Sequence, residues 1–191
     1  MIAPHSVLLA LPPTGSFLAW FWYVRIRRRF ATLVPGRVYR SGTLKPRWLT
    51  VAVRLHAIRT VIDLRRPGPD VDREREFLRG LGVRHINVCA SQRPKAPVIE
   101  AFLAAIDGAE QPVLLHCLHG AGRARLFGAL YRIEYEGWSS ERAARSLPLR
   151  QRGKRRFVRA YVPRRRASPD GAAPGPSSAS SSSSSRYLPA R

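Results

Sequence analysis

The sequence predicts an α/β domain with a small, mainly parallel central sheet flanked by helices. Three short segments rich in branched aliphatic residues, at positions 60–64, 85–88 and 113–115, have the composition and length of buried strands. Segments with helical spacing of apolar residues, such as 45–55 and 98–106, lie between them. Because strands that alternate with helices pair in parallel and carry helices on both faces, this order indicates the fold class.

Each predicted element is bounded by residues that start or stop regular structure. In chain order the elements are an extended piece at 37–40, a helix at 45–55, a strand at 60–64, a helix at 72–81, a strand at 85–88, a helix at 98–106, a strand at 113–115 and a helix at 125–136. The run from Pro67 to Asp70 predicts a loop, and glycines end three of the helices. Ser139 can cap a further helix, without a capping box because Arg142 stands at the third position after it.

Composition divides the chain into an N-terminal segment at 1–30, the α/β domain at 34–161 and a tail at 162–191. Residues 6–24 carry no charge and would span about 28 Å as a helix, close to the thickness of a bilayer core. Aromatic residues near the end of this stretch precede arginines within 25–29, an order typical of a membrane interface. We therefore expect an apolar helix that anchors the protein as a single-pass membrane protein.

Two alternatives to the membrane anchor stay open. Pro, Thr, Gly and Ser at 12–16 interrupt the apolar stretch, so a short arm packed on the domain or lying in the membrane interface also fits. A secretory signal is less favoured, because no basic region precedes the apolar run. For an anchor, the positive-inside rule places the arginines and the domain that follows them in the cytoplasm. The tail is rich in Pro, Gly, Ala and Ser, cannot bury enough apolar surface to offset its ordering entropy, and is predicted to be disordered.

The chain is strongly basic, with 34 Lys and Arg against 12 Asp and Glu and a net charge of +22. This excess favours anionic partners, such as phosphorylated proteins, other phosphomonoesters, acidic lipids or nucleic acid. Nearly all the basic residues are arginine and they are scattered through the chain, so coding bias is an equal explanation. Nucleic-acid binding ranks last, because no recognised nucleic-acid-binding motif accompanies the charge.

Only two cysteines are present, Cys89 and Cys117. Two thiols provide neither a disulfide framework nor a four-ligand zinc site, and we expect no metal and no cofactor. They fit a reducing compartment in which one cysteine is kept for its chemistry. Cys89 follows a predicted strand; a buried thiol is the favoured interpretation, and a reversible disulfide with an oxidised Cys117 is the alternative.

Residues 116–123 carry the most specific pattern in the sequence. A predicted strand leads into His116 and Cys117, and Arg123 stands six positions after the cysteine, where a helix begins. The backbone N–H groups of the intervening turn are expected to point inward and form a nest for an anion, assisted by the positive end of the helix. The predicted phosphate-binding residues are Leu118, His119, Gly120, Ala121, Gly122 and Arg123.

Within this turn, Cys117 is the predicted nucleophile and Arg123 the phosphate clamp. A helix N-terminus and a nearby guanidinium favour the thiolate form of a cysteine, which can attack phosphorus and form an intermediate that water hydrolyses. A planar guanidinium matches two phosphate oxygens and follows charge onto the transition state. We expect His116 to be buried and hydrogen-bonded, so that it supports the loop. His119 either adds positive charge for the substrate or is simply exposed.

The stretch from Cys117 to Arg123 resembles the Cys-x5-Arg signature of the protein tyrosine phosphatase superfamily, in its compact dual-specificity branch. Residues 36–42 resemble the segment that opens this domain in small members, and 58–65 is similar to their central strand. The likeness covers about 34–161, and some bacterial relatives carry an N-terminal membrane segment. It implies hydrolysis of phosphomonoesters without a metal, through a phosphocysteine, with a separate aspartate as general acid.

Three departures from the family pattern bear on activity. Ala124 stands where the family usually has a Ser or Thr whose hydroxyl helps the sulfur leave, and Gly122 stands where many relatives have Asp. The stretch 85–95, where the resemblance implies the general acid, contains neither Asp nor Glu. Asp70 and Asp72 are the best substitutes, although each is more simply a solvated carboxylate at a loop or helix start. We expect Asp63 to make a structural ion pair or hydrogen bond.

The predicted function is therefore a cysteine-dependent phosphomonoester hydrolase, of the tyrosine or dual-specificity phosphatase kind. The alternative is a phosphate-binding module with weak or no turnover, which Ala124 and the missing acid favour. Phosphotyrosine, phosphoserine, phosphoinositide and nucleotide phosphates all remain possible substrates.

Overall fold

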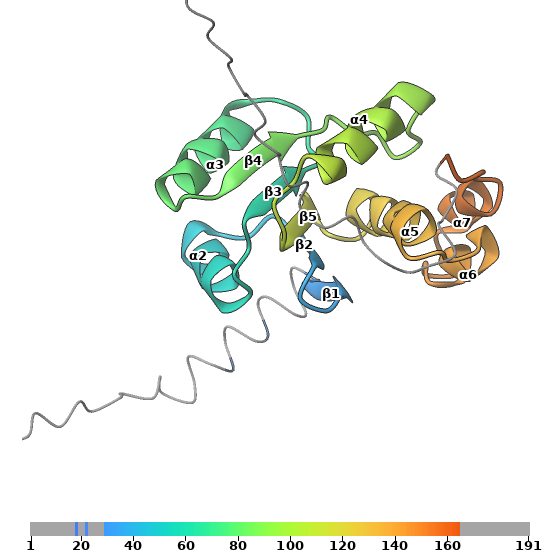
Figure 1. The fold of residues 1–191 in the computed structure, drawn as a ribbon, viewed down its shortest axis with the longest axis horizontal. Helices are drawn as coiled ribbons and strands as arrows, with labels where there is room; N and C mark the ends of the chain where they lie inside the picture. Colours follow the sequence, from blue (N-terminus) through green and yellow to red (C-terminus); the bar gives the residue numbers. More distant parts are fainter. Residues whose placement is uncertain (1–17, 19–21, 23–28, 165–191) are drawn as a thin grey trace, which may run out of the picture.

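A five-stranded sheet forms the centre of the domain in the computed structural model, which describes residues 29–164 together with Leu18 and Trp22 (Figure 1). The strand order is β1-β2-β5-β3-β4. The elements are β1 (Ala31–Val34), β2 (Val38–Gly42), α2 (Pro46–Leu55), β3 (Thr60–Asp63), α3 (Pro69–Gly80), β4 (Arg84–Asn87), α4 (Ala96–Asp107), β5 (Val113–Cys117), α5 (Arg123–Tyr135), α6 (Ser140–Arg145) and α7 (Arg152–Arg159). Four strands run parallel and β1 pairs antiparallel with β2, so the predicted mainly parallel α/β class is confirmed.

Helices cover both faces of the sheet, because successive strand residues point to opposite sides. Val61 and Leu114 pack with α2 and α3 in one apolar cluster. Their chain neighbours Ile62 and Leu115 pack with α4 and α5 in a second cluster, which continues to α6 and α7. Figure 1 shows α2 and α3 on one side of the sheet and α4 to α7 on the other. Strand β5 is therefore enclosed on both faces, and its last residue is Cys117.

Three helices begin earlier than the sequence pattern predicts, and one of them is α5, which begins at Arg123 and not at 125. Helix α3 begins at Pro69 and α4 at Ala96, where the expected starts are 72 and 98. Both contain proline in the first turn, where its fixed φ is favourable and its missing N–H costs no helix hydrogen bond. Proline signals the start of these helices and not only the loop before them. The predicted cap of α6 is confirmed, since the Ser139 side chain accepts a hydrogen bond from the Arg142 backbone N–H.

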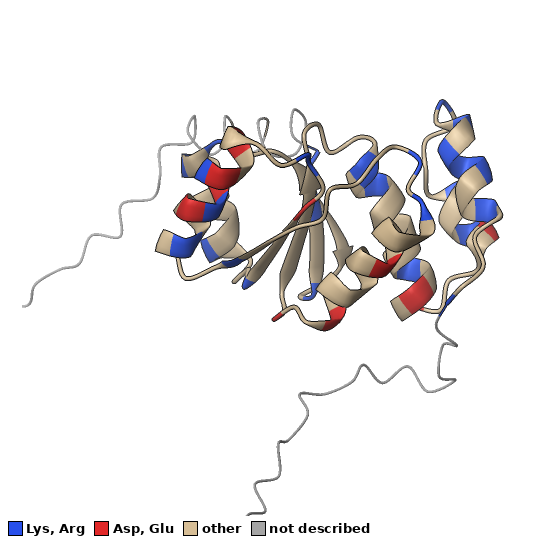
Figure 2. Cartoon of the chain, turned by 90° about the horizontal axis from the view of Figure 1, so that it is seen from above, with Lys and Arg blue, Asp and Glu red and all other residues tan. Residues whose placement is uncertain are grey.

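Strand β1 and helix α7 are absent from the sequence prediction. Strand β1 has four residues and pairs with β2 across a short turn. Helix α7 is basic at five of its eight positions, and its apolar anchor is the fully buried Val158. Figure 2 shows the basic residues concentrated along α7, whereas α3 carries acidic residues as well.

The predicted membrane anchor at 6–24 lies outside the described residues, apart from Leu18 and Trp22, as does the predicted disordered tail from 165 onward. In the part of the chain that the structure describes, we find no helix with the length and apolar character needed to cross a membrane.

Candidate active site

The predicted phosphate loop joins the central strand to the helix behind it. Strand β5 lies between β2 and β3, and its end is aligned with theirs, since Cys117 pairs with Gly42 and His116 with Asp63. The turn after Cys117 leads directly into α5, whose first residue is Arg123. The carboxyl ends of parallel strands are the usual place for a site in an open α/β sheet. The two residues predicted to do the chemistry therefore flank one turn at that edge.

The carbonyl oxygens of this loop are held from outside by residues distant in sequence. The Thr43 backbone N–H donates to the Leu118 oxygen at 3.3 Å, and the Arg29 side chain donates to the His119 oxygen at 3.4 Å. The Arg40 Nη1 atom donates to the Gly120 oxygen at 3.3 Å, and the Gln151 Nε2 atom donates to the Ala121 oxygen at 2.6 Å. Four successive carbonyl groups thus have external partners.

The N–H groups of the same loop are left available. None of the six backbone N–H groups of residues 118–123 donates a hydrogen bond to another residue in the part of the chain that the structure describes. Buried or inward-facing amides normally find an acceptor. Successive free amides beside a helix N-terminus form a nest that binds an anion such as phosphate. Gly120 has φ = 66°, a conformation that other residues rarely adopt, and it lets the loop turn at this point.

Close contact with Gly42 positions the loop against the neighbouring strand. A Cβ atom at this position would lie 2.8 Å from the His119 carbonyl carbon and 3.0 Å from the Gly120 nitrogen. Only glycine leaves room for the loop backbone at this distance.

Arg123 is anchored along one edge of its guanidinium group and free along the other. Its Nη1 atom donates to the Leu64 carbonyl oxygen at 2.6 Å and to the Ala90 carbonyl oxygen at 3.3 Å. Its Nε and Nη2 atoms have no acceptor among the described residues. These two atoms form the face of the guanidinium that binds phosphate in a bidentate manner. The predicted clamp is thus held in place by the ends of two strands, with its binding face open.

Cys117 and Arg123 line one pocket of about 360 Å³ with a markedly positive wall. The Cys117 side chain is buried, with 3% of its surface exposed. The complete lining is Arg29, Gln92, Cys117, His119, Ala121, Gly122, Arg123, Arg150, Gln151 and Lys154. Among the described residues, this lining contains four Lys or Arg side chains and no carboxylate. The adjoining pocket of about 560 Å³ adds Arg65 and Arg66 and also reaches Arg123.

A buried polar network supports the loop from behind. The His116 Nε2 atom lies 2.8 Å from the Glu74 Oε1 atom, although the angle is not that of a hydrogen bond. Arg65 contacts the carboxylates of both Asp63, at 2.7 Å, and Glu74, at 2.9 Å. His116 is thus buried beside an acid, as expected, but its Nε2 atom does not make the hydrogen bond that was also expected. Asp63 makes the predicted structural ion pair.

The carboxylates of this network lie beside Arg65 and two histidines. Burial alone would raise the pKa of Asp63, but contacts with His85, Arg65 and His116 hold it well below its ordinary value of 3.8. Asp63, Glu74, His85 and His116 each offer a ligand atom within 4.8 Å of the others, as a cation site would. Arg65 contacts both carboxylates of this group and so supplies part of the positive charge that they need.

The structure does not bring Asp70 or Asp72 to the loop. Both lie in the first turn of α3, with 80% and 61% of their side-chain surface exposed. Asp70 pairs with Arg73 and Asp72 pairs with Arg75, so they are solvated carboxylates at a helix start. Neither lines the pockets that contain Cys117 or Arg123. The general-acid role suggested for them is not supported by their position.

Ala124 follows Arg123 in the first turn of α5 and is fully buried. It contributes no hydroxyl group at this point, so the departure noted in the sequence persists in the three-dimensional site.

Several residues that shape the site were not identified from the sequence. Arg29, Arg40, Thr43 and Gln151 hold the loop carbonyls, and Gln92 approaches Gly122, where a Cβ atom would lie 2.7 Å from the Gln92 Oε1 atom. The only sequence signal for any of them was the position of Arg40 and Thr43 beside the segment 36–42 that resembles the start of the family's domain.

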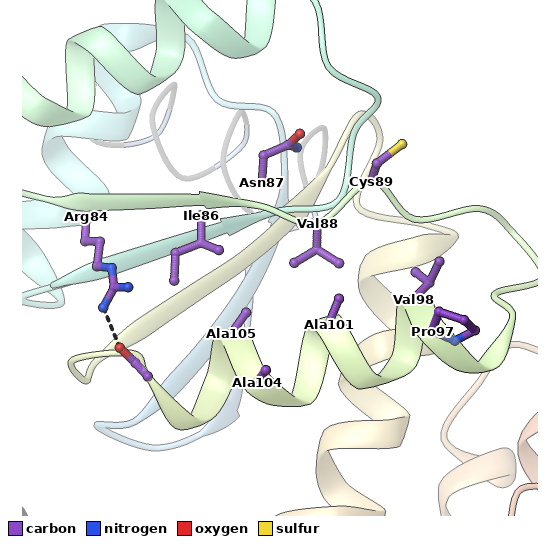
Figure 3. Close-up of a pocket in the computed structure, with 11 residues that line it drawn as sticks. Arg84, Ile86, Asn87, Val88, Cys89, Pro97, Val98, Ala101, Ala104 and Ala105 are labelled. Carbon is purple, nitrogen blue, oxygen red and sulfur yellow. Dashed lines mark hydrogen bonds between the residues drawn. The ribbon is translucent and has the colours of Figure 1, made fainter.

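A separate pocket of about 420 Å³ lies between strand β4 and helix α4, away from the loop (Figure 3). Small side chains of α4, including Ala101 and Ala104, face Ile86 and Val88 across it. No residue of 116–123 lines it. Cys89 lies at its end and is exposed, which corrects the expectation of a buried thiol; β4 ends at Asn87, so Cys89 is already outside the sheet.

Comparison with known proteins identifies phosphatases. The sequence model of a family described as a polymorphic toxin system DSP-PTPase phosphatase (Tc-R-P) matches residues 38–134, from β2 to the end of α5. The dual specificity protein phosphatase TpbA of Pseudomonas aeruginosa strain UCBPP-PA14 is 30% identical over 119 residues, which are 61% of this chain and 50% of that protein. The chain therefore spans about half the length of the curated relatives it matches.

Solved structures agree on the fold. The crystal structure of P. aeruginosa TpbA has a TM-score of 0.59 and 23% identity, and covers 71% of this chain and 86% of its own. The core catalytic domain of the PP-IP phosphatase SIW14 from S. cerevisiae has a TM-score of 0.60 and 18% identity, with the same coverage. At these identities the likeness concerns the arrangement of the sheet and helices. The matched family segment contains the whole phosphate loop but not α6 or α7.

Proposed function

We propose that this chain, which belongs to the DSP-PTPase phosphatase family of polymorphic toxin systems, hydrolyses phosphomonoesters through a phosphocysteine on Cys117. The observation that carries the proposal is the loop at 118–123, whose carbonyls are bonded outward and whose six amides have no acceptor among the described residues. With the open edge of Arg123, these amides form a cradle for a dianion beside the Cys117 sulfur.

The first step transfers the phosphoryl group to the enzyme. The thiolate of Cys117 attacks phosphorus, the S–P bond forms, and the bond from phosphorus to the leaving oxygen breaks. Charge on the three equatorial oxygens is held by the loop amides and by Arg123, whose donors are in place before the reaction. Because no carboxylate lines the pocket, the leaving oxygen takes its proton from water. Good leaving groups, such as a phenolate, are therefore favoured over alkoxides.

The second step returns the enzyme to its free state. Water attacks phosphorus, the S–P bond breaks and inorganic phosphate leaves with the thiolate restored. No hydroxyl at position 124 assists the departing sulfur, so this step is expected to be slower than the first.

The substrate class follows from the positive wall of the pocket. Arg29, Arg150 and Lys154 surround the entrance in addition to the phosphate clamp, without a carboxylate among them. Clustered charge of one sign in a cleft raises the local concentration of oppositely charged substrate. We infer an aryl phosphate that is flanked by further negative groups, as in a phosphotyrosine peptide with acidic neighbours.

The experiment compares hydrolysis of an aryl phosphate by the full chain and by its Cys117→Ser variant. The proposal expects turnover by the first and none by the second, with both unfolding at similar temperatures. Activity that survives Cys117→Ser would overturn it. For the substrate class, phosphotyrosine peptides with acidic flanks should have a higher kcat/KM than matched peptides with basic flanks. An equal or reversed preference would contradict the charge argument.

A second candidate function is phosphate binding with negligible turnover. Ala124 and the lack of a carboxylate in the pocket favour it. Pre-steady-state kinetics with an aryl phosphate separate the two functions. An enzyme releases the phenol in a burst and then continues to release phosphate, whereas a binding module binds a phosphotyrosine peptide and releases no phosphate.

We also propose that the apolar stretch at 6–24 anchors the phosphatase domain to a membrane with the domain on the cytoplasmic side. The support is the sequence pattern of apolar residues, interfacial aromatics and arginines. Expression of the full chain and of a variant lacking 6–24 tests it. The full chain should stay in the membrane fraction after a carbonate wash and the variant should not; equal extraction of both would refute the anchor.

A further inference from the structure

We infer that a second, smaller cavity behind the phosphate loop is a binding site for a free inorganic oxyanion. The cavity has a volume of about 60 Å³ and lies between β1, β2, α5 and the residues after α6. Its wall contains three arginines, Arg40, Arg125 and Arg132, together with the polar residues Thr32 and Ser146. No Asp or Glu within the described part of the chain lines it. It shares no lining residue with the pocket that contains Cys117.

The three guanidinium groups have little compensating charge at this point: Cys117 acts favourably on Arg40 and Glu136 on Arg132, but neither residue lines the cavity. Burial, together with the neighbouring Arg125 and Arg132, lowers the pKa of Arg40 to about 10. Burial also lowers the pKa of Arg125, and Arg29 and Arg150 act in the same direction. Half-buried charges of one sign without a counterion are costly, and proteins normally pair them. An anion among the three would supply the missing charge.

Hydrogen-bond donors point to the same conclusion. The Arg125 Nε atom is buried and has no acceptor among the described residues. Arg132 uses one N–H group for the Leu33 carbonyl oxygen, at 3.3 Å, and Arg40 uses Nη1 for the carbonyl oxygens of Arg29 and Gly120. Each guanidinium has five N–H donors, so several remain for a ligand. A tetrahedral oxyanion accepts many hydrogen bonds and matches this surplus.

The size of the cavity limits the ligand. A single water molecule needs roughly 10–15 Å³ on the same scale, so there is room for one small ion and not for an aryl or nucleoside group. The substrate of the Cys117 pocket cannot enter. Inorganic phosphate or sulfate fits both the size and the donor set, and phosphate is also the product released in the proposed reaction.

Arg40 connects this cavity to the phosphate loop. The same Nη1 atom that faces the cluster donates to the Gly120 oxygen at 3.3 Å. An anion held by the three arginines would fix the Arg40 side chain against the loop and offset the repulsion from Arg125 and Arg132. The site is thus expected to stabilise the fold and to hold the loop in its binding conformation.

The test is thermal unfolding of the full chain in inorganic phosphate at constant ionic strength. Three variants are compared: Arg123→Met removes the clamp of the catalytic loop, Arg125→Met removes one wall of the cavity, and Arg54→Met removes one exposed charge on α2 as a matched control. Phosphate should raise the melting temperature in a saturable way in the wild type, Arg123→Met and Arg54→Met. In Arg125→Met the saturable rise should become smaller, because only the catalytic loop then still binds phosphate, and the melting temperature without phosphate should increase because repulsion is relieved.

A saturable rise that is lost in Arg123→Met and unchanged in Arg125→Met would assign all binding to the catalytic loop and overturn the inference. If Arg125→Met does not fold, crystals of the wild-type protein grown in selenate decide the question. An anomalous difference peak among Arg40, Arg125 and Arg132 supports the site, whereas a peak only beside Cys117 refutes it.

Discussion

The contact between Gly42 and the phosphate loop predicts a large loss of activity from the addition of a single methyl group. In Gly42→Ala the new Cβ atom would lie 2.8 Å from the His119 carbonyl carbon and 3.0 Å from the Gly120 nitrogen. Both neighbours are backbone atoms, so no flexible side chain can move aside. Strand β2 is paired with β1 and β5 on its two sides, so the loop is the part that must shift.

The size of the shift sets the expected loss. Ordinary contacts of a Cβ atom begin at 3.4 Å, so the His119 carbon at 2.8 Å must move by 0.6 Å to reach an ordinary contact. A misplacement of about 1 Å at a catalytic site costs about 10²-fold in rate, because the reacting groups leave their productive alignment. We therefore expect kcat/KM for an aryl phosphate to fall by about 10²-fold in Gly42→Ala.

The assay is steady-state hydrolysis of an aryl phosphate, with urea unfolding of the same preparations as a measure of folding. Gly80→Ala is the matched control, since a Cβ atom at this exposed position of α3 meets nothing within 4 Å. It should keep full activity and gain up to about 1 kcal/mol of stability from helix propensity. If folded Gly42→Ala has wild-type activity, the loop is not positioned by this contact and the geometric account of the site is wrong.

Three further predictions concern the supporting network, the second chemical step and the pocket wall. Asp63→Asn should lower the free energy of unfolding by about 3 kcal/mol in urea denaturation, because Arg65 keeps only Glu74 as its partner. The pKa of Asp63 is held below its ordinary 3.8, so the wild type should lose stability as the pH falls below about 4. This part of the loss should be missing in Asp63→Asn. Identical acid unfolding curves of the two proteins would contradict the prediction. Ala124→Ser should speed breakdown of the phosphocysteine by up to about 10²-fold, visible as a smaller ratio of burst to steady-state rate, and an unchanged ratio would show that the second step is not limited at this position. Removing the charge of Arg150 or Lys154 should raise KM for an acidic phosphotyrosine peptide about two- to fivefold at low salt, with kcat unchanged, and high salt should abolish the difference.

The sheet and the phosphate loop could be predicted from the sequence because their signals are local. Strands β3 and β5 are buried on both faces, so each appears in the sequence as a short run that is rich in branched aliphatic residues. The spacing of Cys117 and Arg123, with Gly120 between them, is a property of the loop itself. The resemblance to a known signature rests on the same residues.

Elements stabilised by distant contacts could not be predicted in this way. Helix α7 has only two apolar residues, Phe157 and Val158, so no periodic pattern is visible. It is held by α6 and by the segment after it, where the Tyr161 hydroxyl donates to Glu134 on α5. Strand β1 likewise depends on its pairing with β2, and its four residues alone do not predict this pairing.

The choice of Asp70 and Asp72 shows the limit of reasoning from chain position. They were the nearest carboxylates after a strand that leads towards the site. The start of α3 at Pro69 places both on the outer surface of the first turn, where Arg73 and Arg75 pair with them. Arg40 and Gln151 could not be predicted for a related reason. Each donates to a backbone carbonyl of a segment that is distant in sequence, and such a contact requires no fixed residue spacing in the chain.

The most direct measurement is rapid acid quench of the full chain with an aryl phosphate, followed by mass spectrometry of the peptide that contains Cys117. The free amides and the open edge of Arg123 should hold the substrate with its phosphorus next to the Cys117 sulfur. The peptide should therefore carry one phosphoryl group in the wild type and in Ala124→Ser, with lower occupancy in Ala124→Ser. Hydrolysis of the substrate with no phosphoryl group on Cys117 at any quench time would contradict the account.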